Sequence, residues 1–332
     1  MQNLIFSFNA TLPLVVVVAL GILLKRIRLV NKEFGAQCDR LVFRVALPVT
    51  LFSNMYFMDI RSAFDGRFVG FCAIATILSI AGVWIGGSLA LRGRKGKHGR
   101  RGEPGKKEDL GELVQASYRG SIAVLGNALL SNIYGSSAMA PLMILGSVPL
   151  YNIAACLILA MCAPDRDDDE ERSMASQLKK GLKGVASNPI ILGIIAGCIC
   201  SLARFHFPQF IDSSVRSVSS LTTPLSLLSI GFGFKGREAL GRLQLSGAAT
   251  IMKLLVIPAV FVPAAVCMGF RGEALIAILI MLGSPSTPSC YTMARNYGYE
   301  GVISASAVVL TMLGSAFSVT LGILVLRTMG LV

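Results

Sequence analysis

The sequence predicts an all-α membrane protein whose ten transmembrane helices form two inverted five-helix repeats. Three observations predict this fold. Hydrophobic residues make up 54% of the 332 residues and charged residues only 15%, whereas a soluble protein has about 25% charged residues. Ten apolar runs approach the ~20 residues that a membrane-spanning helix needs. Helix-breaking residues recur at fixed distances in the two halves of the chain.

The ten apolar runs are expected to be helices, because each is long enough to satisfy its backbone hydrogen bonds internally. In the first half they cover roughly 4–24, 37–57, 68–91, 111–134 and 137–161. In the second half they cover roughly 187–205, 214–233, 245–269, 273–296 and 301–327. The first repeat is therefore expected to be 1–162 and the second 187–332, joined by a linker at 163–186.

The repeat is visible as two sets of matched residues. Pro13, Gly21 and Pro48 match Pro189, Gly197 and Pro224 at an offset of 176, whereas Gly120-Ser121 and Tyr134-Gly135 match Gly283-Ser284 and Tyr297-Gly298 at an offset of 163. Because each half has an odd number of helices, the second half starts on the opposite side of the membrane and the repeat is inverted. Matched interruptions of this kind are typical of secondary transporters. Pro48 and Pro224 are candidate hinges, although static kinks would give the same pattern.

The distribution of lysine and arginine predicts the orientation. With the N-terminus outside, 23 of the 31 basic residues fall on the inner side and six on the outer side, as the positive-inside rule requires. Both termini are then extracytoplasmic, and the basic loop 92–109 and the linker 163–186 are cytoplasmic. We expect an integral protein of a bacterial inner membrane, with loop 92–109 touching anionic lipid head groups rather than nucleic acid.

Enzymatic and metal-dependent functions lack support. Both histidines, His98 and His206, fall in predicted loops, and no phosphate-binding or H-E-x-x-H motif occurs. Most cysteines fall in apolar runs, where cysteine behaves as a small hydrophobic residue. The acidic run 165–171 lacks the glycine of a calcium loop. We therefore predict no enzyme activity, no cofactor and no metal site.

The predicted ninth helix contains the strongest interruption. Pro285 and Pro288 lie three residues apart among the small hydroxylic residues Ser286, Thr287 and Ser289. Proline in a helix interior removes a backbone hydrogen bond and clashes with the preceding turn. The freed backbone groups cannot face lipid, so they are expected to line a cavity enclosed by protein. A kinked packing helix is the alternative.

The predicted fourth helix contains a weaker interruption without proline. Gly120 and Gly126 are its breakers, Ser121 lies between them, and Asn127 can hydrogen-bond exposed backbone. If both helices unwind at one depth, the N-termini of their second halves converge. Such ends carry free N–H groups and partial positive charge, which suit a carboxylate.

Two cations lie inside predicted spans, Arg119 in the fourth helix and Lys253 in the eighth. Each costs about 2.5–3.5 kcal/mol at a helix centre, and no acidic residue lies deep in any span to offset it. The substrate is therefore expected to supply the negative charge. Two alternatives stay open: Arg119 extends to the inner interface, and Lys253 binds backbone carbonyls or serine.

The chain resembles the bacterial branch of the auxin efflux carrier family. The stretches that carry the resemblance are Leu20-Gly21 to Arg26, Ala46-Leu47-Pro48 to Phe52, Tyr118-Arg119-Gly120-Ser121 to Tyr134-Gly135, and Pro285 to Gly298. The resemblance implies ten helices in inverted repeats, with broken helices 4 and 9 crossing at the substrate site, as in the sodium/bile-acid symporters. It also implies a small carboxylate substrate and a homodimer. Ser121 and Ala128 depart from the asparagine and proline that bacterial relatives often have there.

The leading hypothesis is a secondary active transporter that moves a small organic anion by alternating access. Malonate, malate or an auxin-like acid would be its substrate. Coupling to protons or to sodium is left open. A membrane sensor that binds the carboxylate without transporting it, and an anion channel, are the alternatives.

Overall fold

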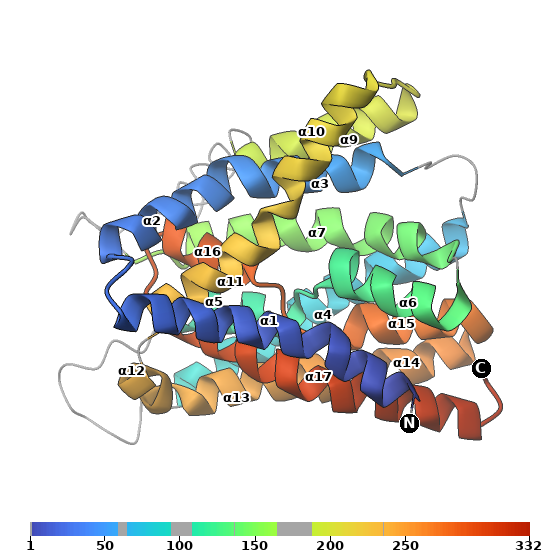
Figure 1. Ribbon diagram of the computed structural model, residues 1–332. Coiled ribbons are helices and arrows are strands. Elements are labelled where there is room, and N and C mark those ends of the chain that lie inside the picture. The colour runs from blue at the N-terminus through green and yellow to red at the C-terminus, as the bar shows by residue number, and fades with distance from the viewer. Residues whose placement is uncertain (1, 59–64, 94–107, 136, 165–187, 235) are drawn as a thin grey trace.

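The computed structural model describes residues 2–58, 65–93, 108–135, 137–164, 188–234 and 236–332. Within these ranges the regular secondary structure is entirely helical (Figure 1). The predicted cytoplasmic loop 92–109 and the linker 163–186, with its acidic run, fall almost wholly outside the described residues. The described ranges together form a helical bundle.

The helices of the first half begin near the N-terminus. They are α1 (Gln2–Arg26), α2 (Lys32–Leu41), α3 (Leu47–Tyr56), α4 (Gly66–Gly93), α5 (Glu108–Tyr118), α6 (Asn127–Tyr134) and α7 (Met139–Met161). A π-helical turn, Val42–Ala46, makes α2 and α3 one continuous rod. A second π-helical turn, Ile122–Gly126, leads into α6.

The remaining described helices belong to the second half of the chain. Its helices are α9 (Pro189–Leu202), α10 (Gln209–Ser220), α11 (Thr222–Gly233), α12 (Gly236–Gly241), α13 (Leu243–Ile251), α14 (Ile257–Cys267), α15 (Gly272–Gly283), α16 (Ser289–Asn296) and α17 (Val302–Thr328). The π-helical turn Met252–Val256 joins α13 to α14. The span expected at 214–233 is instead two helices, since Pro224 has no N–H with which to continue the ladder of α10 into α11.

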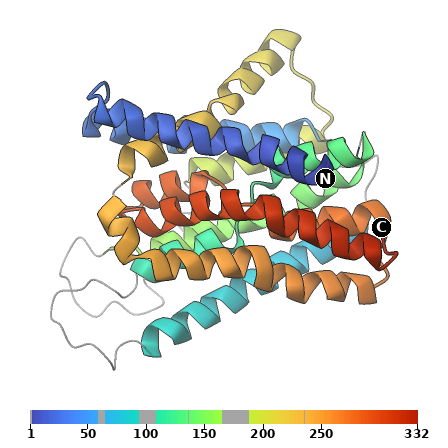
Figure 2. The ribbon, with the colours of Figure 1, turned by 60° about the horizontal axis from the view of Figure 1, so that its bottom comes forward.

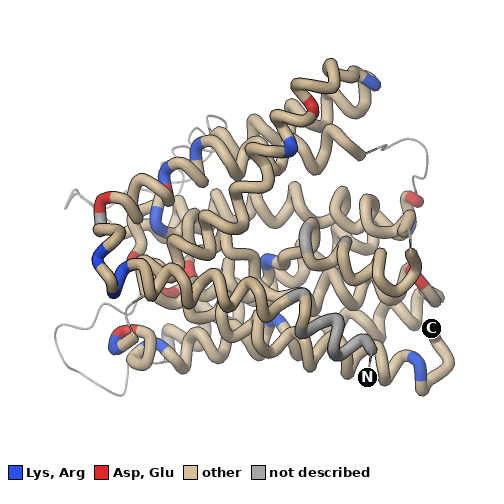
Figure 3. The backbone as a smooth tube through the Cα atoms, in the orientation of Figure 1, with Lys and Arg blue, Asp and Glu red and all other residues tan. Residues whose placement is uncertain are grey.

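Within the described ranges, four continuous helices are long and apolar enough to cross a membrane. They are Gly66–Leu91, Met139–Met161, Leu243–Cys267 and Val302–Thr328, and Pro189–Leu202 and Gly272–Gly283 are shorter apolar helices. Charged residues gather mainly at the two ends of the bundle, and its middle is almost free of them (Figure 3). The chain is thus an integral membrane protein with an apolar body.

The axes of the long helices are roughly parallel, and the two termini lie at the same end of the bundle (Figure 1). The most extensive helix contacts are α3 with α9, α1 with α11, and α4 with α7. α13 packs beside α17, whereas α10 projects beyond the other helices (Figure 2). The contacts of α3 with α9 and of α1 with α11 join helices from different halves of the chain.

Two glycines permit close backbone approaches at these helix contacts. A Cβ on Gly21 of α1 would lie 2.5 Å from the carbonyl oxygen of Leu228 in α11. A Cβ on Gly197 of α9 would lie 2.6 Å from the carbonyl oxygen of Phe52 in α3. Both distances are shorter than any side chain allows, so only glycine permits these approaches. Gly197 and Leu228 lie 176 positions after Gly21 and Phe52, respectively, so the two contacts are related by the sequence repeat.

Two of the three described π-helical turns precede a proline. The π-helical turn Val42–Ala46 comes just before Pro48, and Met252–Val256 comes just before Pro258. The ring of a helical proline clashes with the carbonyl four residues earlier, and a wider turn moves that carbonyl away. π-Helical turns are frequent at functional sites, and the second of these turns contains Lys253. Pro224, the other candidate hinge, lies in the first turn of α11.

Candidate functional site

Two interrupted helices meet near the centre of the bundle. α5 ends at Tyr118, residues 119–121 are not helical, and helix resumes at Ile122. α15 ends at Gly283, residues 284–288 are not helical, and α16 begins at Ser289. The first break forms without a proline, and both lie where the sequence predicted interruptions. The four half-helices provide two C-terminal ends and two N-terminal ends, where backbone groups need partners outside the regular helical pattern.

The two breaks are bonded directly to each other. The amide of Ser121 donates to the carbonyl of Pro285 at 2.8 Å. The Ser286 hydroxyl donates to the carbonyl of Ala116 at 2.6 Å, and its amide donates to the Thr311 hydroxyl at 3.0 Å. These bonds satisfy backbone groups that the breaks leave unpaired. The two segments are therefore held as one crossing unit.

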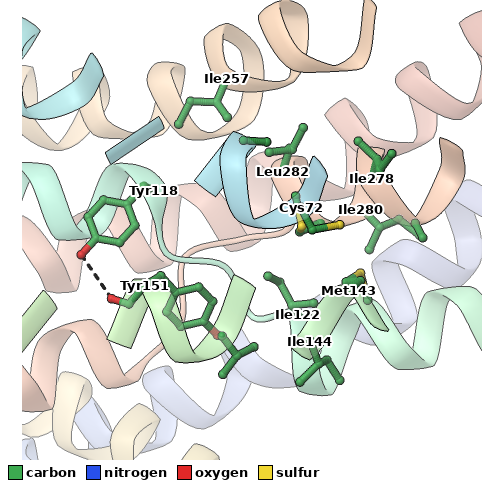
Figure 4. Close-up of a cluster of buried hydrophobic side chains, with 14 of the residues drawn as sticks. Cys72, Tyr118, Ile122, Met143, Ile144, Tyr151, Ile257, Ile278, Ile280 and Leu282 are labelled. Atoms are coloured by element: carbon green, nitrogen blue, oxygen red, sulfur yellow. Dashed lines mark hydrogen bonds between the residues drawn. The ribbon is translucent and has the colours of Figure 1, made fainter. Parts of the chain in front are cut away.

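Gly120 lies at the point of closest approach. A Cβ at this position would be 2.5 Å from the Ser284 hydroxyl oxygen and 3.1 Å from the Lys253 ammonium nitrogen. The Gly120 carbonyl accepts a bond from the Tyr151 hydroxyl at 3.2 Å. Figure 4 shows Tyr151 beside Tyr118, whose hydroxyl donates to the Tyr151 carbonyl at 3.3 Å, within the buried cluster around the crossing. The side chains of Ser284, Lys253 and Ile122 fill the space that a side chain at position 120 would need.

Lys253 joins the C-terminal end of α5 to that of α15, the helices that precede the two breaks. Its ammonium group donates to the carbonyl of Tyr118 at 3.2 Å and to that of Leu282 at 2.8 Å. These carbonyls belong to the last turns of α5 and α15, where partial negative charge accumulates. The side chain is 1% exposed. The sequence left open whether Lys253 faces a substrate or binds backbone carbonyls or serine. In the structure its ammonium group binds backbone carbonyls.

Arg119 begins the first break and is also buried, with 1% of its surface exposed. It therefore does not extend to the membrane interface. One guanidinium nitrogen donates to Asn152 Oδ1 at 2.8 Å and to the Ser289 hydroxyl at 2.9 Å. The other approaches Gln115 Oε1 at 3.4 Å and the Met293 sulfur at 3.0 Å. The guanidinium also lies 5.6 Å from the centre of the Tyr151 ring.

All these partners of Arg119 are uncharged. Within the described part of the chain, no carboxylate forms an ion pair with Arg119, and its Nε has no hydrogen-bond partner. Ser289, which it contacts, is the first residue of α16, so the guanidinium lies near a positively polarised helix end. Positive potential is thus concentrated here with no described acid to neutralise it.

The structure places the other predicted residues around the same crossing. Pro285 and Pro288 are buried within or beside the break, and the Thr287 hydroxyl lies 3.1 Å from that of Ser289. Gly126 ends the π-helical turn, where a Cβ would lie 3.2 Å from the Met143 methyl group. Asn127 begins α6, and its side chain lies outside the described residues.

The sequence reasoning missed Gln115, Asn152, Tyr151 and Thr311. All four are polar or amphipathic residues within strongly apolar helices. Their sequence neighbours form no motif of helix-breaking or charged residues that would have pointed to them. The signal available was that buried polar side chains inside a membrane need partners and usually serve a site. Gln115 also precedes Arg119 by four residues, which places the two on one helix face.

The buried acid Glu112 of α5 lies near the start of α17. Its two carboxylate oxygens accept bonds from the amides of Gly301 and Ser304, both at 2.9 Å. This caps the N-terminus of α17 from another helix. Glu112 is therefore engaged with backbone and lies apart from the crossing.

Comparison with known proteins gives consistent results. The membrane transport protein family matches residues 6–323. An uncharacterized transporter of Methanocaldococcus jannaschii is 21% identical over 308 residues, 91% of this chain and 93% of the relative. The probable auxin efflux carrier components 5a and 5b of Oryza sativa subsp. japonica are 25% and 26% identical, covering 37% and 40% of this chain and 35% and 37% of their own lengths. The chain therefore belongs to the membrane transport protein family, the family of the auxin efflux carriers.

Proposed function

We propose that the protein is a secondary active transporter that carries a small organic anion by alternating access. The observation that carries this proposal is the crossing of two interrupted helices around Arg119, a buried cation whose described partners are all uncharged. A buried cation without an ionic partner is costly. An anionic substrate entering beside it would supply the missing charge.

The anion site that we propose lies between Arg119 and the start of α16. Ser289 and Thr287 provide hydroxyl groups there, at the positively polarised N-terminal end of α16. The break at Gly120 and Ser121, with Gly126 and Asn127, provides the facing wall. Arginine suits a carboxylate because its guanidinium binds both oxygens at once. Malonate, malate or an auxin-like acid fits these groups.

Lys253 contributes to this site indirectly. Its two carbonyl bonds hold the C-terminal ends of α5 and α15 together, which keeps the two breaks in register. Its charge also adds to the positive potential at the crossing, because a buried charge is weakly screened. We assign to Lys253 the role of a positioning residue.

Ten spans in two inverted repeats are part of the proposal. The mirrored contacts of Gly21 with Leu228 and of Gly197 with Phe52 support it. So do Gly135 and Gly298, which match in the repeat and have φ values of 76° and 93°. The first repeat would be 1–162 and the second 187–332, with both termini outside a bacterial inner membrane. Labelling of single cysteines placed in 92–107 and beyond the C-terminus, from each side of sealed vesicles, tests this orientation.

Counterflow in proteoliposomes tests the transport activity. Vesicles loaded with unlabelled malonate, malate or indole-3-acetate should accumulate the same labelled acid from outside, transiently and with saturation. Binding without counterflow would identify a sensor, and flux that neither saturates nor exchanges would identify a channel. The absence of both binding and flux for every acid would contradict an anion site at the crossing. A homodimer is expected from the family resemblance and can be measured in the same preparations.

A further inference from the structure

One buried acid lies where α2 and α11 touch α16, the second half of the interrupted ninth predicted span. This acid is Asp39 of α2, and its neighbours are α11 and α16. We propose that Asp39 is the protonation site that couples transport to a proton gradient. The inference rests on the proposed function, because it assigns the coupling ion of that transporter.

The contacts of Asp39 connect three helices. One carboxylate oxygen accepts a bond from the Ser229 hydroxyl of α11 at 2.6 Å. The other lies 3.8 Å from Nε of Arg295 in α16. The Asn296 side chain, also in α16, donates to the main-chain carbonyl of Asp39 at 2.9 Å. Asp39 is 5% exposed, so its charge is little screened by water. The carboxylate therefore attaches α16, and the break before it, to α2 and α11.

Asp39 differs from the other two acids that are buried in the described part of the chain. Glu112 has both oxygens bonded to amides at the start of α17. Asp109 forms an ion pair with Arg242. The Asp39 carboxylate has only one hydroxyl hydrogen bond and one long ion pair. Protonation of Asp39 therefore disrupts weaker interactions than protonation of Glu112 or Asp109 would. Of the three, Asp39 is the one whose carboxylate forms an ion pair with α16 in the described part of the chain.

The charged and titratable groups around Asp39 favour a response to its protonation. α16 presents Arg295 and Tyr291 to it, and α2 itself carries Cys38 and Arg40. Arg44 in the following π-helical turn is exposed, and α11 has no ionisable residue. Protonation removes the attraction to Arg295, which keeps its bonds to the carbonyls of Tyr299 and Glu300. α16 then loses its ionic attachment to α2 without leaving a bare cation.

At the positions that correspond in the sequence repeat, the ion pair of Asp39 and Arg295 has no counterpart. At the two repeat offsets, Asp39 corresponds to Val215 and Arg295 corresponds to Asn132, whereas Ser229 corresponds to Ser53. The counterpart position thus keeps the serine but has no group that titrates. A proton on Asp39 changes the stability of one arrangement of the crossing relative to the other. A ligand with such a differential effect shifts the equilibrium between two states.

Transport by the Asp39→Asn variant tests the proposal. Proteoliposomes are given a pH gradient of either polarity and labelled malonate, malate or indole-3-acetate, and counterflow is measured in parallel without a gradient. Asparagine keeps the shape and the Ser229 bond but cannot bind the coupling proton. We expect counterflow within threefold of the wild type and at least a tenfold loss of gradient-driven accumulation. Asp39→Glu should restore accumulation, and Glu33→Gln, an exposed acid on the same helix, should leave it unchanged.

A second measurement does not depend on the substrate. Hydrogen–deuterium exchange at one fixed pH should be at least threefold faster for residues 289–296 in Asp39→Asn than in Glu33→Gln, because α16 has lost its attachment. Gradient-driven accumulation that survives in Asp39→Asn would overturn the inference while leaving the transporter intact. Loss of counterflow together with accumulation in that variant would also overturn it. Absence of counterflow in the wild type would instead contradict the proposed function.

Discussion

The main-chain amide of Ser121 donates a hydrogen bond to the main-chain carbonyl of Pro285, 2.8 Å away. This bond joins the break of the fourth predicted span directly to the break of the ninth, although the two residues lie 164 positions apart. Pro285 has no N–H of its own, so it can only accept at this point. The bond therefore couples the two breaks, as a shared substrate site requires.

Gly120→Ala should disrupt the crossing. The added Cβ would meet the Ser284 hydroxyl at 2.5 Å and the Lys253 ammonium at 3.1 Å. Overpacking of this kind costs about 1–3 kcal/mol, so we expect a lower thermal midpoint in detergent and loss of counterflow. Gly82→Ala is the matched control, because a Cβ at that position of α4 meets nothing within 4 Å. Equal midpoints for the two variants would show that the crossing has room to spare.

Arg119→Gln should weaken substrate binding. Glutamine is uncharged and cannot bind both oxygens of a carboxylate as a guanidinium does. We expect the half-saturation concentration for malonate in counterflow to rise at least tenfold, which corresponds to about 1.4 kcal/mol. Arg327→Gln, at the exposed end of α17, should leave it unchanged. An unaltered half-saturation concentration in Arg119→Gln would remove this residue from the site.

Lys253→Met should destabilise the folded protein even in the absence of substrate. The substitution leaves the carbonyls of Tyr118 and Leu282 without the donor they share. Hydrogen bonds to charged groups contribute about 1.5–3 kcal/mol each, partly offset here because a buried charge is also removed. The net effect should appear as a lower thermal midpoint. Lys25→Met, which loses a single exposed bond to the Phe234 carbonyl, should change the midpoint little; a larger effect there would contradict the interpretation.

Gly21→Ala and Gly197→Ala should have similar effects. Each added methyl group would lie 2.5–2.6 Å from a backbone carbonyl of the facing helix, and backbone cannot rotate away as a side chain can. We expect both variants to lose about 1–3 kcal/mol of stability, seen as comparable drops in thermal midpoint. Gly70→Ala, which meets nothing within 4 Å, serves as control. A large effect at one glycine and none at the other would argue against the mirrored repeat.

Several features of this protein follow from the sequence by itself, because they depend on local chemistry. Long apolar runs must form helices in a membrane, since each backbone polar group needs a partner. Glycine and proline weaken a helix where they cluster, and the breaks at 119–121 and 284–288 lie where such residues predicted them. The composition likewise determined that the protein belongs in a membrane.

Only the tertiary structure decided which groups meet at the crossing. Arg119 contacts Asn152 and Ser289, and Lys253 binds carbonyls from two separate helices. Asp39 contacts Ser229 and Arg295, which are also far from it along the chain. Such contacts depend on how the helices pack and on the depth at which they cross. A single sequence carries no periodic signal for either, because the partners lie far apart along the chain.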